Sequence, residues 1–504
     1  MATNLPRTAT LIALVAALCG CIVTPMPPAA GIDTPAAPAT PVPTETPTAG
    51  AEGIGDPYFP AMGNGGYDVQ RYVLDLDVDV AANTIVGTTI IEALATESLS
   101  RFHLDFVGPA IAEVTVDGAL AEVDRLDGEL VITPAEPLAA GQAFTTSITY
   151  SGLPGAHRAE GDARYSRGWH HYGEGILVAS EPSGASSWYP VNDHPLDKAP
   201  YTMRITVPEP YVVAANGVLV RVEEGEGTRT YHWEEDNPMA SYVATVGIAE
   251  FERVEAGVAA GVPIRNYFPV DLPESVRQGY GRTGEMLAFF SEAFGPYPFD
   301  AYGVVVHDED LGFALETQTL SLFGRGLPRE NTVAHELAHQ WFGNSVSPAA
   351  WQHIWLNEGF ATYAAALWGE HSLGPEAGAE YMNQAMLGLY RSAAEVRAGL
   401  GRAPAAVPAV AAAPLHPLSG VRQEAPFVIG DPTPERLFDR LVYNRGALTL
   451  HALRLRLGDD PFFRVLRAYY ARHAEGVAAT KDFVAVAEEV SGEDLDAFFR
   501  AWLF

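Results

Sequence analysis

Two patterns of hydrophobic and polar positions follow one another along the chain. In the first, apolar residues such as Tyr72, Leu74 and Leu76 alternate with mostly polar ones. A period of two is typical of β-strands that bury one face. Further stretches of this kind occupy residues 142–150, 201–207 and 241–248. Few helical signals lie between them, so residues 57–255 are predicted to form an all-β domain.

The second pattern begins near Pro273, where apolar residues recur every three or four positions. This period is typical of helices with one buried face. The segments that carry it are 286–293, 331–342, 354–367 and 462–472. Residues 256–504 are therefore predicted to be mainly helical, and the expected fold class is α+β with more than one domain. A stretch rich in alanine and proline, 397–434, is predicted to be a long loop.

The first 20 residues are typical of a signal peptide, with Arg7 followed by an apolar run. This run ends in the sequence Leu-Cys-Gly-Cys, with Cys21 last, which resembles the lipobox of bacterial lipoproteins. The resemblance implies lipidation of Cys21 and a membrane-anchored protein at the cell surface or in the periplasm. Ordinary secretion and an uncleaved anchor are the alternatives. Residues 21–56, rich in proline, alanine and threonine, are predicted to be an extended tether.

Composition narrows the expected chemistry. A chain of 504 residues, 48% of them hydrophobic, can form two or three well-developed cores. The formal net charge of -32 argues against nucleic acid as a partner, since nucleic acid requires a basic surface. The only two cysteines, Cys19 and Cys21, lie at the end of the signal. The domains are therefore predicted to hold no disulfide and no catalytic thiolate, so metal ligands must be nitrogen or oxygen atoms.

The strongest chemical signal is an H-E-x-x-H sequence formed by His335, Glu336 and His339, with Glu358 following after eighteen residues. Positions i and i+4 lie one above the other on a helix, so His335 and His339 can bind one metal ion. Glu358 is well placed to supply a third ligand. Two histidines and a glutamate leave the fourth position of a tetrahedral zinc ion open for water. Three protein ligands and one open position are typical of a catalytic zinc site.

A bare H-E-x-x-H also arises by chance, in a helix with two half-exposed histidines and a solvated glutamate. In this chain the flanking residues 332–334 and 337–338 are largely apolar, so the helix is predicted to be buried on most sides. Unpaired polar groups in a buried helix cost several kcal/mol. One zinc ion per chain would satisfy them.

Beyond the metal motif, the sequence resembles the M1 family of zinc metallopeptidases, the group of aminopeptidase N and leukotriene A4 hydrolase. Four further segments carry the resemblance, in the order found in the family. They are Glu-Pro-Ser-Gly-Ala at 181–185 with Trp-Tyr-Pro-Val-Asn-Asp at 188–193, Gly-Pro-Tyr-Pro-Phe at 295–299, Gly-Phe-Ala-Leu-Glu-Thr at 312–317, and Tyr-Asn-Arg-Gly-Ala at 443–447. The resemblance covers residues 57–504. It implies a saddle-like N-terminal β domain, a thermolysin-like catalytic domain and peptide substrates.

The resemblance also implies roles for individual residues. Glu336 would be the general base, which takes a proton from water and passes one to the leaving amine. Tyr443 would donate its phenol to the oxyanion. Glu316 would bind the free ammonium group of the substrate. Without the resemblance, Tyr443 would be interpreted as a core or interface tyrosine and Glu316 as a solvated glutamate.

Several positions depart from the family pattern. Phe313 and Thr317 stand where the family has glycine and asparagine, so the pocket for the first substrate side chain is expected to differ. The backbone around Ala314 is still expected to bind substrate. The loop that contains His194 and Lys198 is predicted to be structural.

A second departure concerns recognition of the substrate amine. The family places glutamine or glutamate where this chain has Ala179. Glu181 and Ser180 are the candidates to replace it; otherwise recognition rests on Glu316.

The expected function is that of a zinc-dependent aminopeptidase. The alternatives are a broader zinc hydrolase, acting as an endopeptidase or like an epoxide hydrolase, and a non-catalytic peptide-binding surface protein. The oligomeric state and the preferred N-terminal residue cannot be predicted from the sequence.

Overall fold

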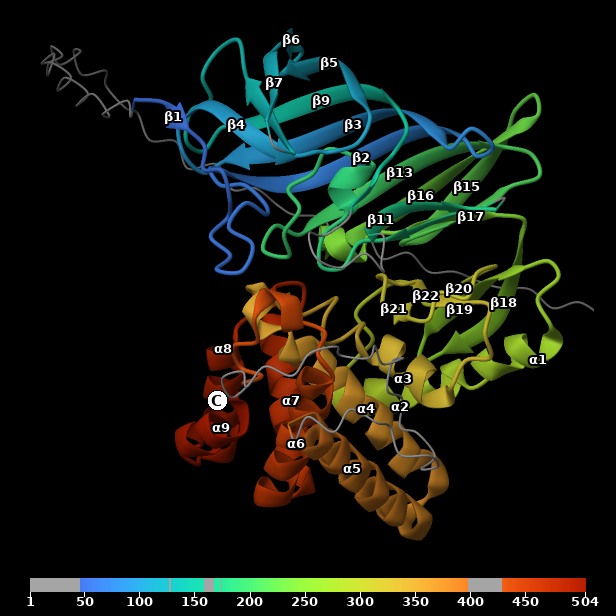
Figure 1. The fold of residues 1–504 in the computed structure, drawn as a ribbon, viewed down its shortest axis with the longest axis vertical. Helices are drawn as coiled ribbons and strands as arrows, with labels where there is room; N and C mark the ends of the chain where they lie inside the picture. The colour runs from blue at the N-terminus through green and yellow to red at the C-terminus, as the bar shows by residue number, and fades with distance from the viewer. Residues whose placement is uncertain (1–45, 127, 158–166, 174, 398–427) are drawn as a thin grey trace, which may run out of the picture. The chain divides into compact units, whose positions relative to one another are not determined.

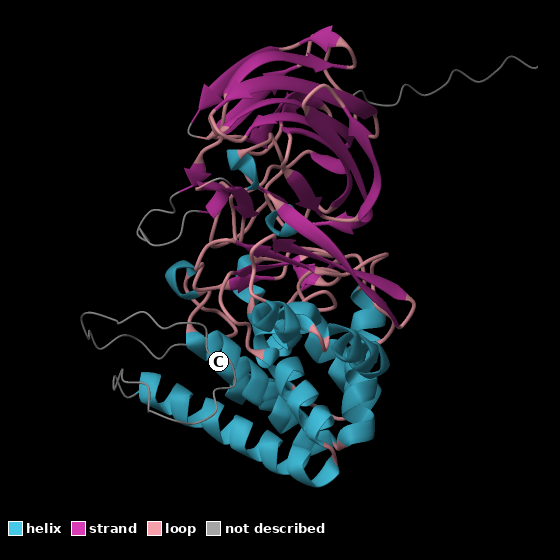
Figure 2. Cartoon of the chain, turned by 90° about the vertical axis from the view of Figure 1, so that its right-hand side faces the viewer, coloured by secondary structure: helices cyan, strands magenta, loops and turns pink. Residues whose placement is uncertain are grey.

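Strands build the N-terminal part of the described chain and helices most of the C-terminal part (Figure 1, Figure 2). The computed structural model describes residues 46–126, 128–157, 167–173, 175–397 and 428–504. The predicted signal peptide, the predicted lipidation at Cys21 and most of the predicted loop lie outside these residues. The predicted α+β class, with an all-β region before a mainly helical one, is confirmed.

An eight-stranded sheet with the order β15-β16-β13-β2-β3-β9-β5-β6 is the largest in the β-rich part. Its strands are β2 (Tyr67–Asp79), β3 (Thr84–Ala95), β5 (Ala110–Val116), β6 (Ala119–Leu120), β9 (Ala143–Gly152), β13 (Ala199–Pro208), β15 (Val218–Glu224) and β16 (Thr228–Met239). Tyr72, Leu74 and Leu76 of β2 all point into the core. The period of two in the sequence therefore corresponds to the buried face of a central strand.

Two smaller sheets complete this part, with the orders β1-β4-β8-β7 and β10-β11-β12-β17-β14. The first contains β1 (Thr48–Ala49), β4 (Leu99–Asp105), β7 (Glu122–Leu126) and β8 (Glu129–Thr133). The second contains β10 (Ala156–His157), β11 (Arg167–Tyr172), β12 (Gly175–Ala179), β14 (Val212–Ala215) and β17 (Val246–Ala249). The stretch 241–248, predicted as one strand, begins as a short 3-10 helix, η2 (Ser241–Val243), and only then enters β17.

A mixed sheet with the order β18-β19-β20-β22-β21 opens the C-terminal part. Its strands are β18 (Phe251–Ala259), β19 (Val262–Pro269), β20 (Val304–His307), β21 (Ala314–Leu315) and β22 (Ser321–Gly324). The predicted domain boundary between residues 255 and 256 falls inside β18. β18 pairs with β19 on both sides of an irregularity between Glu255 and Val258, and β19 in turn lies parallel to β20, so the hairpin belongs to this sheet.

The helices that follow include the four predicted segments, as α2, α3, α4 and α7, and several that the sequence pattern did not reveal. They are α1 (Glu274–Arg277), α2 (Thr283–Phe294), α3 (Glu330–Ala338), α4 (Trp355–Leu373), α5 (Pro375–Arg397), α6 (Arg440–Leu457), α7 (Asp459–His473), α8 (Thr480–Ser491) and α9 (Asp496–Leu503). In the ranges that the structure describes, none of the helices has both the length and the apolar character of a membrane span.

The last residues of the predicted tether belong to the fold, which corrects the prediction for residues 46–56. Thr48 and Ala49 pair with β4 as a parallel strand. Asp56 is buried, and its Oδ2 accepts hydrogen bonds from Nε2 of His194 (3.1 Å) and from the backbone N–H of Trp351 (2.8 Å). Trp351 opens η4 (Trp351–His353), directly before α4. Asp56 therefore connects the start of the folded chain to the helix that carries Glu358.

Asp56 should make stability depend on pH. Burial alone would raise the pKa of its carboxyl, but hydrogen bonds from His194 and from backbone N–H groups, including that of Trp351, outweigh burial and lower the pKa below 3.8. A lowered folded-state pKa stabilises the protein at neutral pH, and this stabilisation is lost as the pH falls through that pKa. Asp56→Asn is expected to lower the free energy of unfolding at pH 7 by about 2 kcal/mol.

Urea denaturation at pH 7 and at pH 3 measures this effect, with the exposed Asp300→Asn as the matched control. The difference between wild type and Asp56→Asn should shrink at pH 3. An equal difference at both values would contradict the assignment of the effect to the Asp56 charge.

Candidate active site

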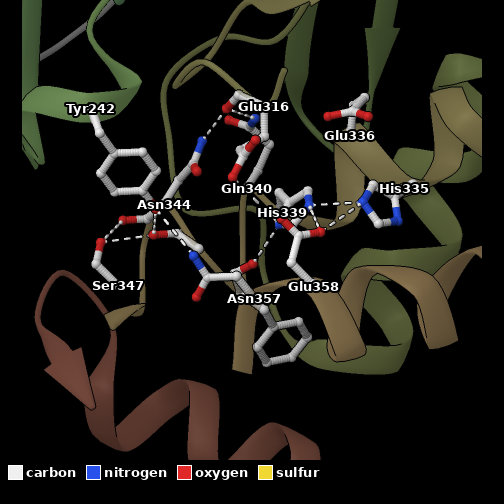
Figure 3. Close-up of polar contacts among 12 residues, drawn as sticks. Tyr242, Glu316, His335, Glu336, His339, Gln340, Asn344, Ser347, Asn357 and Glu358 are labelled. Carbon is white, nitrogen blue, oxygen red and sulfur yellow. Dashed lines mark hydrogen bonds and ion pairs between the residues drawn. The ribbon is translucent and has the colours of Figure 1, made fainter. Parts of the chain in front are cut away.

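Two helices bring the predicted metal ligands together (Figure 3). Helix α3 (Glu330–Ala338) carries His335. His339 follows directly, and its N–H donates to the His335 carbonyl (3.2 Å), which keeps His339 one helical turn after His335. Helix α4 carries Glu358 in its first turn. The Nδ1–H of His339 donates to the carbonyl of Phe342 (3.0 Å). This bond fixes the imidazole so that its Nε2 lone pair faces His335 and Glu358.

The three ligand atoms form a triangle that fits a tetrahedral metal ion. His335 Nε2 lies 3.0 Å from His339 Nε2, and Glu358 Oε2 lies 3.3 Å and 3.5 Å from these two nitrogens. Zinc bonds of 2.0–2.2 Å at tetrahedral angles place ligand atoms about 3.3–3.5 Å apart. Two imidazole nitrogens and one carboxylate oxygen are also the donors that zinc prefers, so the residues present fit the ion.

The electrostatics of the site favour a cation. Burial lowers the pKa of His335. Burial would do the same for His339, but the facing carboxylates of Glu316 and Glu358 raise its pKa well above the ordinary value. A site that draws a proton onto a buried imidazole has an excess of negative charge, and a dication offsets this excess more fully than a proton does.

Glu336 lies beside the ligands without being one of them. Its carboxylate is buried, and one of its oxygens lies within 4.8 Å of a carboxylate oxygen of Glu316 and a ring nitrogen of His339. Burial raises the pKa of Glu336 well above 4.5, and the charges of Glu316 and Glu358 act in the same direction, while His339 opposes them. A carboxylate with a raised pKa next to a metal site is suited to accept and return a proton.

Glu316 follows β21, and its side chain is only 3% exposed. Its Oε1 lies 3.8 Å from Nδ1 of His339. Its backbone carbonyl accepts two hydrogen bonds from the segment that follows α3, from Nε2 of Gln340 (3.2 Å) and Nδ2 of Asn344 (2.6 Å) (Figure 3). The position of Glu316 is therefore set by the same segment that positions His339.

Strand β21 is the end strand of its sheet, and β22 is its partner among the described strands. Successive residues of a strand direct their backbone groups to opposite sides, so one of Ala314 and Leu315 directs its N–H and C=O away from β22. Ala314 is half-buried next to Glu316. An extended peptide can add to a strand edge of this kind.

Glu181 also reaches the site, from the β-rich part of the chain. A carboxylate oxygen of Glu181 lies within 4.8 Å of those of Glu316 and Glu358. Ala179 is buried at the end of β12 and Ser180 is fully buried, so of the two candidates named from the sequence, Glu181 is the one that joins the carboxylates.

Tyr443 lies on α6, and its ring stacks on that of His335 with 6.1 Å between centroids and 16° between planes. Helix α6 also packs closely against α4, and two glycines, Gly359 of α4 and Gly446 of α6, allow this close packing. A Cβ atom on Gly359 would lie 2.8 Å from Cα of Gly446, and one on Gly446 would lie 2.6 Å from Cα of Gly359. Burial raises the pKa of Tyr443 well above 10, and the charge of Glu358 adds to this. The phenol therefore keeps its proton and remains a donor.

Several residues of the site were not found from the sequence. Tyr242, in η2, donates its hydroxyl to the carbonyl of Gly343 (2.8 Å) and accepts from Nδ2 of Asn357 (3.3 Å). Gln340 and Asn344, which hold Glu316, are likewise buried. The one signal that could have revealed Gln340 and Asn344 is that they are polar residues in an otherwise apolar stretch after His339.

Comparison with known proteins agrees with this geometry. Residues 280–502 match the model of the peptidase family M1 domain, and residues 68–243 match the model of the peptidase M1 N-terminal domain. A crystal structure of an M1 zinc metallopeptidase from Deinococcus radiodurans is similar, with 31% sequence identity and a TM-score of 0.76. The match covers 90% of this chain and 97% of that chain. That structure is of a glutamate-to-alanine mutant bound to a Tyr-Ser-Ala substrate.

Two longer relatives are similar at lower identity. Aminopeptidase M1 of Arabidopsis thaliana and aminopeptidase N of Streptomyces lividans are each 25% identical to this chain over 86% of its length. The chain spans about half the length of these relatives, 50% in each case.

The two-part fold and the His-His-Glu site together define a zinc metallopeptidase. The chain belongs to the M1 family of zinc metallopeptidases, in a form with two domains. The resemblance stated from the sequence is confirmed for the family and for the zinc site of His335, His339 and Glu358.

Removing the ligand Glu358 should release the metal, whereas changing Glu336, a nearby carboxylate that is not a ligand, should not. Glu358→Gln is expected to weaken zinc binding at least about 100-fold, since even groups that only support a ligand contribute 10–100-fold. Glu336→Gln is the matched control, because it changes a buried carboxylate of the same site that is not a ligand. The measurement is the zinc content of both variants after dialysis, determined by elemental mass spectrometry. Equal zinc content in both variants would contradict the ligand set.

Proposed function

We propose that this protein is a zinc-dependent aminopeptidase that removes N-terminal residues from peptides. The observation that carries the proposal is the closeness of Glu181 and Glu316 to the metal ligand Glu358, with carboxylate oxygens within 4.8 Å of one another. Two carboxylates beside a metal site can hold the ammonium group of a peptide. A peptide held by its amino end then has its first peptide bond next to the metal.

The residues around that bond supply the rest of the chemistry. Zinc, when bound, contributes Lewis acidity. Glu336 accepts the proton of the attacking water and returns a proton to the leaving amine. Tyr443 donates its phenol hydrogen to the carbonyl oxygen as that oxygen gains negative charge, a contribution of about 3–4 kcal/mol for donors of this type. The backbone around Ala314 aligns the substrate through the open edge of β21.

The comparisons support the same proposal. The Deinococcus radiodurans relative, which this chain matches over nearly its whole length, was crystallised with the tripeptide Tyr-Ser-Ala bound. The longer relatives are named aminopeptidases. A broader zinc hydrolase and a non-catalytic peptide-binding protein are the competing functions that an experiment must separate.

Free and blocked substrates separate these functions. We expect the zinc-loaded protein to cleave aminoacyl fluorogenic substrates and to leave their N-acetylated forms intact. The reason is that acetylation removes the charge that Glu316 and Glu181 hold. Glu336→Gln should lower kcat at least about 100-fold, within the range of general acid–base catalysis. Initial rates across a panel of paired substrates provide the measurement.

Two variants complete this test. Glu316→Gln should reduce the preference for free over acetylated substrates, with zinc content unchanged. Equal cleavage of both forms by the wild-type protein would favour the broader hydrolase, and no cleavage of either form would favour a binding protein.

We also propose that the protein is a lipoprotein anchored in a membrane through Cys21 and exposed at the cell surface or in the periplasm. The support lies in the sequence: the apolar run after Arg7, the Leu-Cys-Gly-Cys sequence and the proline-rich residues that follow. A lipid at Cys21 would leave the residues before the first described strand, β1, as the connection to the membrane.

Two neighbouring cysteines allow a matched test of the anchor. In cells expressing the full chain, Cys21→Ser should abolish both incorporation of labelled palmitate and recovery in the membrane fraction. Cys19→Ser should leave both unchanged, because the thiol that the lipobox pattern marks is that of Cys21. Labelling that survives Cys21→Ser would refute the anchor.

A further inference from the structure

Lys198 joins the β-rich part of the chain to the segment that follows the zinc-binding helix. Its Nζ donates to the backbone carbonyls of Asn344 (2.8 Å), Ser345 (2.9 Å) and Gly476 (3.4 Å). An ammonium group has three hydrogens and no acceptor. Lys198 therefore uses its full hydrogen-bonding capacity on three carbonyls of the C-terminal part.

Asn344 carries this contact to the active site. Its carbonyl accepts from Lys198, its N–H donates to the carbonyl of His339 (3.0 Å), and its Nδ2 donates to the carbonyl of Glu316 (2.6 Å). The last bond is visible in Figure 3. One residue thus connects the ammonium of Lys198 with the backbone of Glu316, whose carboxylate faces the metal site.

The residue type at this position is unusual for the chain. Lysine and arginine together number 31, and only Lys198 and Lys481 are lysines, so 29 of the cations are arginines. A compact ammonium carries its three hydrogens on one atom, whereas a guanidinium spreads its donors over a rigid plane. Burial lowers the pKa of Lys198 to about 7, with Glu475 and Glu235 opposing the shift. Burying the Lys198 charge costs free energy, and the hydrogen bonds to the three carbonyls offset this cost.

We propose that Lys198 is a positioning residue for recognition of the substrate's amino group. Acting through Asn344, it fixes the backbone of Glu316 and so the distance between the Glu316 carboxylate and the metal. The inference rests on the proposed function, because it assumes that Glu316 holds an ammonium group. The competing explanation is a bridge that only stabilises the fold, which would affect all ligands equally.

Binding without turnover tests the proposal. In a zinc-loaded Glu336→Gln background, calorimetry compares the tripeptide Tyr-Ser-Ala with its N-acetylated form. Lys198→Met is expected to weaken binding of the free tripeptide about 5- to 10-fold, the effect of losing one hydrogen bond. Binding of the acetylated form should stay within about twofold. Lys481→Met, at an exposed position, is the matched control and should change neither.

A second variant keeps the test decisive if Lys198→Met does not fold. Asn344→Ala removes the bond to Glu316 and should weaken binding of the free tripeptide by a similar factor. Where both variants fold, the double variant should be no weaker than either single one, since they act in one chain of contacts. Zinc content and the melting temperature confirm that each variant is intact.

Three results would overturn the proposal. They are an equal loss of affinity for both forms of the tripeptide, no loss for either form, and binding in the Glu336→Gln background that does not distinguish the two forms. Failure of the proposed function would instead appear as an inability of the protein with Glu336 intact to cleave Tyr-Ser-Ala. The binding contrast between variants does not depend on that cleavage.

Discussion

The gathering of carboxylates around two buried imidazoles is the constraint on which the active site depends. Glu358 lies close to both histidines, Glu316 and Glu336 lie close to His339, and Glu181 lies close to Glu316 and Glu358. Glu358, Glu316, Glu336 and His339 are buried. Like charges at such distances repel strongly when water is excluded. A dication at the triangle of His335, His339 and Glu358 is the group that makes this arrangement favourable, so metal binding and the local fold are coupled.

The β-rich part of the chain helps to form the site directly. It contributes the Glu181 carboxylate, the Tyr242 hydroxyl that supports Gly343, and the Lys198 ammonium that holds the segment after α3. Asp56, near the start of the described chain, binds the N–H of Trp351 just before the helix of Glu358. The helical part alone would lack these contacts, which is a physical reason for the two parts to occur together.

Much of the fold and the centre of the site could be predicted from local patterns. The period of two at Tyr72, Leu74 and Leu76 marks a buried strand face, and the period of 3.6 marks α2, α3, α4 and α7. Helices α1, α5, α6, α8 and α9 and the small mixed sheet were missed, since their limits depend on contacts with distant segments. The tether prediction was wrong for residues 46–56 because composition does not show that Asp56 finds buried donors in His194 and Trp351.

The sequence by itself determined the zinc ligands, because the spacing of His335 and His339 is a local property of a helix and Glu358 follows in a recognisable setting. Only the tertiary structure decided that Glu181 reaches the metal site and that Lys198 and Asn344 support Glu316. These contacts join residues more than a hundred positions apart in the chain or from different elements. Their geometry follows from packing of strands against helices, which no local pattern contains.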